Sequence, residues 1–329
     1  MDVFFYEAFA EEERILKELL DSGVTCDFTA KTIQEAGHAF PPARIISIRT
    51  QSVVPVAWAK KIGGILSRTT GYDHLLTYLA NIQKPLPCGY LEEYATRAVA
   101  EQAIMLMMTL LRKLPQQMLQ FRLFARDGLT GGECQGKNLL VVGVGRIGSE
   151  IAEIARGIGM NVKGVDIVAR HSHITYIDKI AGIRWADVVI CAMNLTGENT
   201  GYFSYDLLRQ GKKGIVFLNI ARGEHSPAAD LLKLLQEAHI GAAGLDVYEN
   251  EPAVAVSLRN PAEPQSQEAA IIRMLMNYPN VICTPHNAFN TLEAVERKSR
   301  FTVEQIMYFL EHNDFKSMSK VLHVFTSDP

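Results

Sequence analysis

The run Leu139-Leu140-Val141-Val142-Gly143-Val144-Gly145-Arg146-Ile147-Gly148 decides the fold class of this 329-residue chain. Its apolar start predicts a buried strand, and the segment from Ile147 to Ile158 has the spacing of an amphipathic helix. Gly143 permits a tight turn, Gly145 lets a pyrophosphate approach the backbone, and Gly148 lets the helix pack on the strand. The helix N-terminus attracts phosphates. This order therefore predicts a dinucleotide-binding unit in a doubly wound parallel sheet.

A carboxylate stands where such a unit holds the adenosine ribose. Asp166 follows the apolar stretch Val162 to Val165 and can accept hydrogen bonds from the ribose hydroxyls. Because a carboxylate repels a 2′-phosphate, the sequence favours NAD, although Arg170 and His171 nearby leave some tolerance of NADP open. FAD is disfavoured, since FAD folds usually carry this fingerprint at the start of the chain. A glycine-rich turn in an ordinary α/β protein is the bland alternative.

The sequence predicts an α/β fold with two domains, because the chain is longer than the ~250–300 residues at which one core stops growing. Apolar runs after the glycine turn predict a six-stranded doubly wound (Rossmann) sheet; they include NVKGVD, VVICAM, GIVFLNIA and AAGLDVY. We interpret residues 253–276 as an insertion, and the sequence does not indicate its role. Its first part, Ala253 to Gln267, holds two prolines and is predicted to be a loop.

The amino-terminal part shows the same alternation of strand and helix, which indicates a smaller, flavodoxin-like α/β domain. Its expected strands are Val3 to Tyr6, Val24 to Phe28, Ile45 to Ile48 and Gly64 to Ser67. Ala98 to Leu114 is apolar almost all round and predicts a buried helix at a domain crossover. Leu292 to His312 has a helical pattern that could return to the first domain. We therefore expect a substrate-binding domain at 1–98 plus 292–329 and a dinucleotide-binding domain at 99–291.

Composition excludes several classes of protein. A net charge of −3 gives no general attraction to nucleic acid or to an anionic membrane. The longest apolar stretch without charge, Gln102 to Leu111, is about half the ~20 residues that span a bilayer. The acidic amino terminus does not resemble a secretion signal, which predicts a cytoplasmic location. Five widely spaced cysteines without a C-x-x-C motif argue against a disulfide framework or a metal site and favour reduced, mostly buried thiols.

Polar side chains follow three further predicted strands, at the edge where doubly wound folds bind ligands. The segments are NIARG at 219–223, GLDVYENEP at 244–252 and TPHNAF at 284–289. Taken singly, Arg222 reads as an ion-pair partner, Glu251 as a solvated acid and His286 as a capping or packing histidine. Their occurrence together at strand ends favours a catalytic set.

With these motifs in place, the stretch from about Ile65 to Thr302 resembles the D-isomer-specific 2-hydroxyacid dehydrogenase family. The motifs that carry the resemblance are GVGRIGSEIAEIARGIGMNV, NLTGENTGYFSYDLL, FLNIARGE, GAAGLDVYENEP and NVICTPHNAFNT. YENEP with a long insertion, and Tyr94 in EEYATRAVAE, are similar to the D-lactate dehydrogenase branch. The resemblance implies that Arg222, Glu251 and His286 are catalytic.

The resemblance also implies which residues bind the cofactor and the substrate. The expected NAD-binding residues are Gly143, Gly145, Arg146, Ile147, Gly148, Asp166, Ala221 and Asp246, the last lying near the nicotinamide. The expected substrate contacts are Thr70, Gly71, Tyr94 and Phe289, with Thr70 and Gly71 in a loop whose amides hold the carboxylate. No metal is implied, and the helix from Ala98 resembles the region that forms a homodimer.

The chemistry needs these residue types. Reduction of a 2-oxo acid builds negative charge on the carbonyl oxygen, so a proton donor must lie in reach, and His286 suits that role. Glu251 would orient the ring and favour its protonated form. Arg222 offers a planar fork for the substrate carboxylate. The glutamate also argues against the formate dehydrogenase relatives, which carry glutamine there.

The predicted function is reversible, NADH-dependent reduction of a small, pyruvate-like 2-oxo acid to the D-2-hydroxy acid. Two departures put the exact substrate in doubt: Arg97 replaces a common asparagine, and His225-Ser226-Pro227 replaces the usual valine-aspartate. Two alternatives stay open. One is oxidation of phosphite or phosphoglycerate, for which Arg49, Arg68 and Arg97 could supply positive charge. The other is an NAD-sensing binding protein without turnover.

Overall fold

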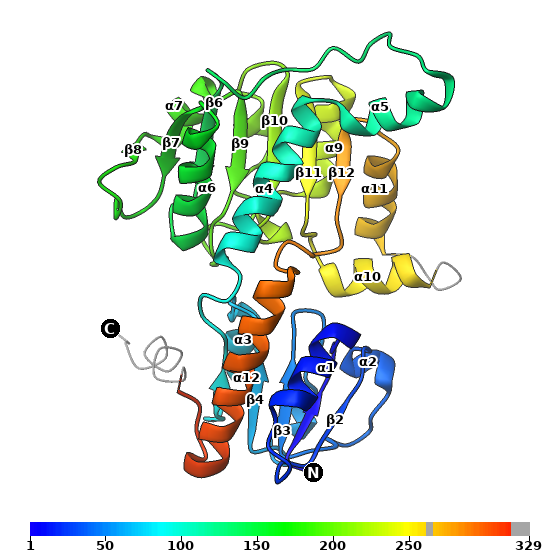
Figure 1. The fold of residues 1–329 in the computed structure, drawn as a ribbon, viewed down its shortest axis with the longest axis vertical. Helices are drawn as coiled ribbons and strands as arrows, with labels where there is room; N and C mark the ends of the chain where they lie inside the picture. The colour runs from blue at the N-terminus through cyan, green and yellow to red at the C-terminus, as the bar shows by residue number, and fades with distance from the viewer. Residues whose placement is uncertain (261–265, 317–329) are drawn as a thin grey trace. The chain divides into compact units, whose positions relative to one another are not determined.

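The computed structural model describes residues 1–260 and 266–316 and divides into two compact units (Figure 1). Unit 1 comprises Met1–Ala95 and Asn290–Pro329, and unit 2 comprises Thr96–Phe289. Both units are α/β folds built on a parallel sheet, as the sequence predicted. In both, the strands are rich in Val, Ile and Leu because each sheet is covered on its two faces.

Unit 1 holds, within its described residues, a five-stranded sheet in the order β2-β1-β3-β4-β5. The strands are β1 (Val3–Phe5), β2 (Cys26–Phe28), β3 (Ile45–Ile48), β4 (Gly64–Ser67) and β5 (Cys88–Gly89). The helices are α1 (Ala10–Leu19), α2 (Ile33–Ala36), η1 (Val56–Trp58), α3 (Asp73–Ile82) and α12 (Leu292–His312). Val3 of β1 lies opposite both Cys26 and Ile45. This strand order is the flavodoxin-like one.

Local sequence signals mark the start of two helices of unit 1, α2 and α12. At α2 the Thr32 side chain accepts from the Glu35 amide and Glu35 accepts in return from the Thr32 backbone, a complete capping box. Thr291 caps α12 in the same way by accepting from the Ala294 amide. α12 covers the predicted span Leu292 to His312 and belongs to unit 1.

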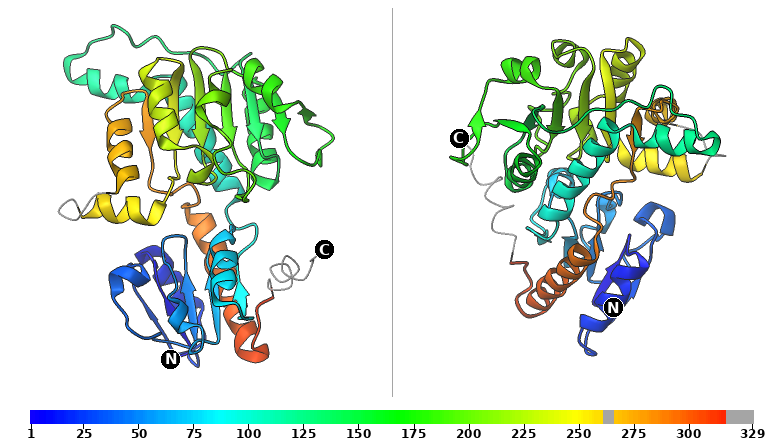
Figure 2. Two further views of the ribbon diagram at one scale, coloured as in Figure 1. Left: turned by 180° about the vertical axis from the view of Figure 1, so that it is seen from behind. Right: turned by 45° about the horizontal axis from the view of Figure 1, so that its top comes forward.

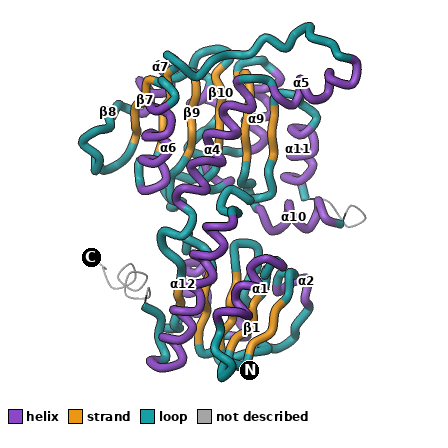
Figure 3. Tube along the Cα trace, viewed as in Figure 1, coloured by secondary structure: helices purple, strands orange, loops and turns teal. Residues whose placement is uncertain are grey.

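Unit 2 holds a seven-stranded sheet in its described part, in the order β12-β11-β10-β9-β6-β7-β8 (Figures 1 and 3). The strands are β6 (Asn138–Val142), β7 (Asn161–Val165), β8 (Thr175–Tyr176), β9 (Val188–Cys191), β10 (Ile215–Asn219), β11 (Ile240–Leu245) and β12 (Val281–Cys283). The chain reverses its winding direction between β6 and β9, and this switch point is where doubly wound folds bind nucleotides.

Helices cover both faces of this sheet (Figure 2). α4 (Thr96–Leu111) and α6 (Arg146–Gly157) pack against one another on one face. The remaining elements of unit 2 are α5 (Leu114–Gln120), η2 (Phe121–Leu123), α7 (Lys179–Trp185), α8 (Tyr205–Leu208), η3 (Gly223–His225), α9 (Ala228–Gln236), α10 (Glu251–Arg259) and α11 (Gln267–Met276). No helix in the described ranges has both the length and the apolar character needed to cross a membrane.

The structure corrects several expectations. Two short edge strands, β5 and β8, escaped prediction because two residues give no readable period. The loop predicted at 253–267 is wrong over its first part, where α10 runs to Arg259. That helix forms because Pro252 lies in its first turn, which tolerates proline, and because Val254 and Ser257 are buried where α10 packs on α11. Residues 261–265, with both prolines of that stretch, lie outside the described residues.

Two expectations about burial are also corrected. The helix predicted as buried on all sides, α4, exposes Met105 and Met108 on one face. Of the five cysteines, which are all unpaired, only Cys88 and Cys191 are fully buried. The expectation of mostly buried thiols is therefore wrong for three of them.

Candidate active site

The glycine turn after β6 has the shape that the sequence predicted. Gly143 has a φ of +89°, and a Cβ there would lie 2.6 Å from the Met193 amide nitrogen. A Cβ on Gly148 would lie 2.0 Å from the Gly143 carbonyl oxygen. By contrast, no heavy atom lies within 4 Å of the position that a Cβ on Gly145 would take. Two glycines are thus needed for packing, whereas Gly145, at the N-terminus of α6, leaves space for a phosphate.

Asp166 lies at the end of β7 and is held by the glycine turn. One carboxylate oxygen accepts from the Val144 amide at 2.6 Å, and the other accepts from the Val168 amide at 3.1 Å. A carboxylate oxygen can accept more than one hydrogen bond, so the fixed side chain keeps capacity for ribose hydroxyls. Arg146 is exposed and Ile147 is half-buried in the first turn of α6. These residues fit a dinucleotide.

Arg222 follows β10 in a turn that Asn219 builds. The buried Asn219 amide donates to the Arg222 carbonyl and to the Ser226 hydroxyl, both at 2.8 Å, and its oxygen accepts from the Ala221 amide at 3.1 Å. The half-buried guanidinium of Arg222 donates through Nη1 to the Ala221 carbonyl at 2.9 Å. The turn therefore fixes the side chain at the carboxyl end of the sheet.

Gly223 brings this turn against the segment that leads to Glu251. A Cβ on Gly223 would lie 1.8 Å from the carbonyl carbon of Tyr248 and 2.1 Å from the Glu249 amide nitrogen. Only a glycine allows two backbones to approach so closely. Tyr248 is itself buried and donates to the Leu245 and Thr284 carbonyls at 3.1 and 2.8 Å. Its hydroxyl thereby ties the end of β11 to the end of β12.

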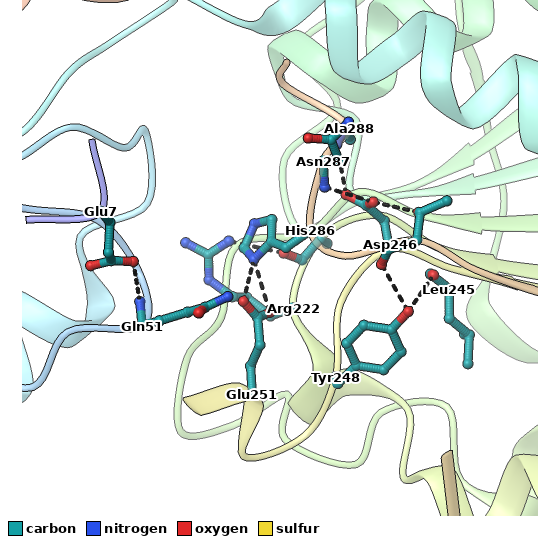
Figure 4. Close-up of polar contacts among 12 residues, drawn as sticks. Glu7, Gln51, Arg222, Leu245, Asp246, Tyr248, Glu251, His286, Asn287 and Ala288 are labelled. Atoms are coloured by element: carbon teal, nitrogen blue, oxygen red, sulfur yellow. Dashed lines mark hydrogen bonds and ion pairs between the residues drawn. The ribbon is translucent and has the colours of Figure 1, made fainter. Parts of the chain in front are cut away.

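The side chains of Glu251 and His286 are hydrogen-bonded to one another, although the two residues are 35 positions apart in the sequence (Figure 4). His286 Nδ1 lies 2.8 Å from both carboxylate oxygens of Glu251, and the two side chains are 18% and 14% exposed. A carboxylate only accepts, so Nδ1 carries the proton of this bond. The other ring nitrogen, Nε2, is thereby left as the one that exchanges a proton with a ligand.

Asp246 organises the loop that carries His286. Its fully buried carboxylate accepts from the Thr284 hydroxyl at 2.5 Å and from the Asn287 and Ala288 amides at 2.9 Å (Figure 4). His286 has a φ of +50°, the left-handed conformation that these bonds hold in place. Burial raises the pKa of Asp246, and the hydrogen bonds from Thr284 and the loop amides oppose that rise. Both oxygens are thus engaged with the loop.

The structure brings part of the predicted set together. Arg222, Glu251 and His286 follow β10, β11 and β12, which are consecutive strands of one sheet, so all three stand at the same edge. Phe289 is buried at the end of unit 2. The other predicted substrate contacts belong to unit 1, where Thr70 is exposed, Gly71 is half-buried and Tyr94 is buried, with its carbonyl accepting from Arg297. The described residues contain no group of three or more acids, cysteines or histidines placed to hold a metal.

Sequence reasoning missed the residues that support this site. Asn219, Tyr248 and Thr284 lie inside the three quoted segments, but residue type alone did not indicate their hydrogen bonds. Asn219 and Tyr248 donate to backbone carbonyls, and Thr284 donates to the Asp246 carboxylate. His225 is fully buried, and its Nε2 lies 3.3 Å from the Met193 carbonyl. Burial and the nearby Arg222 lower the pKa of His225 to about 4, so this histidine is neutral at pH 7.

Comparison with known proteins agrees with this geometry. The model of the family described as D-isomer specific 2-hydroxyacid dehydrogenase, NAD binding domain, matches residues 104–288. The D-lactate dehydrogenase of Streptococcus agalactiae serotype V is 30% identical over 259 residues, which cover 74% of this chain and 75% of that protein. The D-lactate dehydrogenase of Escherichia coli K12 is 32% identical over 219 residues, covering 65% and 66%.

Solved structures show the same fold. The D-lactate dehydrogenase from Aquifex aeolicus, in complex with NAD and lactic acid, has a TM-score of 0.83 at 23% identity and covers 95% of this chain and 96% of its own. The two parallel-sheet units, the glycine turn and the strand-end acid define an NAD-dependent oxidoreductase. The chain belongs to the D-isomer-specific 2-hydroxyacid dehydrogenase family, whose members act on 2-hydroxy acids.

Proposed function

We propose that this enzyme reduces a small, pyruvate-like 2-oxo acid with NADH to the D-2-hydroxy acid, and catalyses the reverse reaction. The observation that carries the proposal is the hydrogen bonding between His286 and Glu251. The Glu251 carboxylate engages Nδ1 of the imidazole, so Nε2 is the nitrogen that exchanges a proton with the substrate. Protonated Nε2 donates to the substrate carbonyl oxygen in reduction, and neutral Nε2 accepts the hydroxyl proton in oxidation. The carboxylate of Glu251, 2.8 Å from Nδ1, offsets the charge of the imidazolium.

The bound cofactor would supply the hydride as NADH in reduction and accept it as NAD⁺ in oxidation. The residues that would hold it lie at the carboxyl edge of the unit 2 sheet. Gly143, Gly145 and Gly148, with Arg146 and Ile147, would receive the pyrophosphate, and Asp166 the ribose. Ala221 and Asp246 are proposed to flank the nicotinamide. For Asp246 this role is indirect, because its oxygens are bonded to the His286 loop.

Arg222 is proposed to bind the substrate carboxylate and to polarise the reacting carbonyl. Its guanidinium is anchored by the bond from Nη1 to the Ala221 carbonyl, and a planar guanidinium matches the geometry of a carboxylate. A fixed positive charge directed at a developing oxyanion is usually the largest catalytic contribution. Thr70, Gly71, Tyr94 and Phe289 remain proposed substrate contacts, with unit 1 as the substrate-binding domain and unit 2 as the dinucleotide-binding domain.

The relatives support a 2-oxo acid but differ in its size. They include D-lactate dehydrogenases and an aromatic 2-oxoacid reductase from Clostridium sporogenes that is 30% identical over 224 residues. We propose that this enzyme acts on a small 2-oxo acid. The match to the D-lactate dehydrogenase of Streptococcus agalactiae covers 259 residues, whereas the match to the aromatic 2-oxoacid reductase covers 224.

The structure weakens the phosphorylated-substrate alternative. Arg68 is fully buried and bonded within unit 1, and Arg97 forms ion pairs with Glu101 and Glu150 at 2.6 and 2.8 Å. Two of the three arginines that could bind a phosphate are therefore engaged elsewhere. A binding protein without turnover is disfavoured by the assembled His286–Glu251 pair, which a cofactor sensor does not need.

The assembly is proposed to be a homodimer in the cytoplasm. In unit 2, α5 and η2 expose a dense group of apolar side chains, namely Leu114, Met118, Leu119, Phe121, Leu123 and Phe124. Apolar patches of this kind mark protein interfaces, and a second copy of the chain would cover them. Light scattering should give twice the mass of one chain, and the mass of a single chain would contradict the dimer.

A panel of 2-oxo acids, assayed for oxidation of NADH and of NADPH, tests the function. We expect pyruvate or a similarly small 2-oxo acid to have the highest kcat/KM. NADH should exceed NADPH by at least about tenfold, because Asp166 repels a 2′-phosphate. Absence of turnover with every 2-oxo acid of the panel would refute the proposed activity. Equal kcat/KM values with NADH and NADPH would refute the role of Asp166 in cofactor selection.

A further inference from the structure

A chain of hydrogen bonds links helix α3 to the loop that follows β4 in unit 1. His74 Nε2 lies 2.8 Å from the Ser67 hydroxyl oxygen, which lies 2.7 Å from the Thr69 hydroxyl oxygen. The Thr69 hydroxyl in turn lies 2.7 Å from the carbonyl oxygen of Gly71. Ser67 and Thr69 are 0% and 5% exposed, and His74 is half-buried. The chain therefore runs from a helix, through buried hydroxyls, to the backbone of the loop.

The donor and the acceptor of each bond in this chain can be assigned. A carbonyl oxygen only accepts, so the single proton of the Thr69 hydroxyl is donated to Gly71. Thr69 has no second hydroxyl proton, so Ser67 donates its own proton to the Thr69 oxygen. The proton between His74 and Ser67 must then come from the imidazole, which assigns it to Nε2. All three bonds thus run in one direction, and each polarises the next.

The last bond of the chain fixes the orientation of the peptide between Gly71 and Tyr72. The described peptide bonds are trans, and in a trans peptide the carbonyl and the amide point in opposite directions. Because the Gly71 carbonyl is turned toward the buried Thr69 hydroxyl, the Tyr72 amide points away from it. A flip of this peptide would exchange the two groups. Glycine has an unusually free backbone, so the flip is easy unless a hydrogen bond opposes it.

The amides of this loop are available to an anion. Within the described ranges, the backbone amides of Thr70, Gly71 and Tyr72 donate to no acceptor. They lie directly before α3, which is ten residues long and has no side-chain cap at Tyr72. The N-terminus of such a helix carries a partial positive charge that favours an anion. A carbonyl turned toward the same place would repel the anion.

We propose that His74 is a positioning residue for substrate binding, because the chain that it begins holds the Gly71–Tyr72 peptide with its amide, and not its carbonyl, toward the carboxylate of the 2-oxo acid. The inference rests on the proposed function, in which this loop binds the carboxylate. His74 acts through the two hydroxyls and takes no part in the transfer of the hydride or the proton. It sets the affinity for the substrate.

The first test is the full-length Thr69→Val variant, which keeps the shape of the side chain and removes its hydroxyl. We expect its KM for the best 2-oxo acid to exceed that of the wild type by about tenfold, the usual effect of losing one hydrogen bond to a charged group. The value of kcat should stay within about twofold of wild type, because the carboxylate is bound alike in the ground state and the transition state. The KM for NADH should not change.

Variants of His74 test whether the effect passes along the chain. His74→Phe keeps a ring but has no donor, and it should raise the same KM by about threefold, because the two hydroxyls keep their own bond. His74→Gln offers an amide N–H in place of Nε2–H and should restore a KM close to that of the wild type. When Thr69→Val and His74→Phe are combined, KM should rise by less than the product of the two single increases, because both substitutions break one chain.

Thr77→Val is the matched control in α3. Thr77 is exposed and donates to the Asp73 carbonyl at 3.1 Å, one turn earlier in the same helix. Its replacement removes a threonine hydroxyl outside the chain and should leave KM unchanged.

The chain can also be observed without turnover. Nitrogen-15 NMR distinguishes a protonated from an unprotonated imidazole nitrogen, and we expect His74 Nε2 to carry a proton. This measurement needs neither substrate nor cofactor.

Three results would overturn the inference. An unprotonated Nε2 would contradict the direction of the chain, and an unchanged KM in Thr69→Val would remove the peptide orientation from substrate binding. A His74→Gln variant as impaired as His74→Phe would make the ring a packing element only. Failure of the wild type to reduce any 2-oxo acid is visible before any variant is made and would refute the proposed function, whereas the NMR measurement still reports whether the chain exists.

Discussion

Replacing His286 with alanine is expected to lower the turnover of the best 2-oxo acid by about 10²–10⁴, the usual loss when a general acid is removed. The reason is geometric: Glu251 holds Nδ1 at 2.8 Å, so Nε2 is the ring nitrogen that serves the substrate. The Kd of NADH should stay within about twofold of wild type, because the glycine turn and Asp166 are untouched. Steady-state kinetics and fluorescence titration with NADH measure the two quantities.

His312→Ala is the matched control for this variant. His312 is an exposed histidine at the end of α12, where its ring stacks on Tyr308. Its removal should leave kcat near the wild-type value. Near-wild-type turnover by His286→Ala would mean that the proton comes from another group, and the proposed mechanism would then be wrong.

Arg222→Lys is expected to lower kcat/KM for the 2-oxo acid by about 10²–10³, a loss typical of removing one donor to a developing oxyanion. Lysine keeps the positive charge but lacks the planar guanidinium, so it cannot form a bidentate pair of hydrogen bonds with the substrate carboxylate. The loss should appear with every 2-oxo acid of the panel, because all of them share the carboxylate and the reacting carbonyl. NADH affinity should be retained.

Arg184→Lys gives the control in the same unit. Arg184 lies in α7 and donates to Gln210 on the surface, so its replacement should change neither kcat nor KM. If Arg222→Lys instead loses NADH binding in the titration, Arg222 belongs to the cofactor site and not to the substrate.

The cofactor half of the site could be predicted from the sequence because its parts are local. A strand, three glycines and a helix follow one another within 20 residues, and each glycine has a separate expected role. At Gly143 and Gly148 the structure shows why glycine is needed, because a Cβ at either position would lie too close to neighbouring backbone atoms. The positions of α12 and of most strands could also be predicted, because the periodic spacing of apolar residues is a property of contiguous sequence.

Local patterns failed where tertiary contacts decide. The apolar stretch after Glu251 gave no clean period, yet it forms α10 because it packs on α11. The strands β5 and β8 exist only through pairing with a neighbouring strand. Glu12 is 56 positions from Arg68 and 286 positions from Lys298 in the sequence, yet folding brings both cations to within 3.0 Å of its carboxylate.

The sequence by itself determined most of the strands and helices, the glycine turn and the position of Asp166, which is proposed to select the cofactor. These features depend on residue type at a fixed local spacing. The resemblance of several motifs to one family pointed to the three candidate catalytic residues. Only the tertiary structure decided that Nδ1 of His286 meets Glu251, that Asp246 serves the loop around His286, and that Lys298 stands beside a carboxylate already shared with Arg68. Hydrogen-bond partners and burial depend on which distant segments meet in space, and no spacing along a chain encodes them directly.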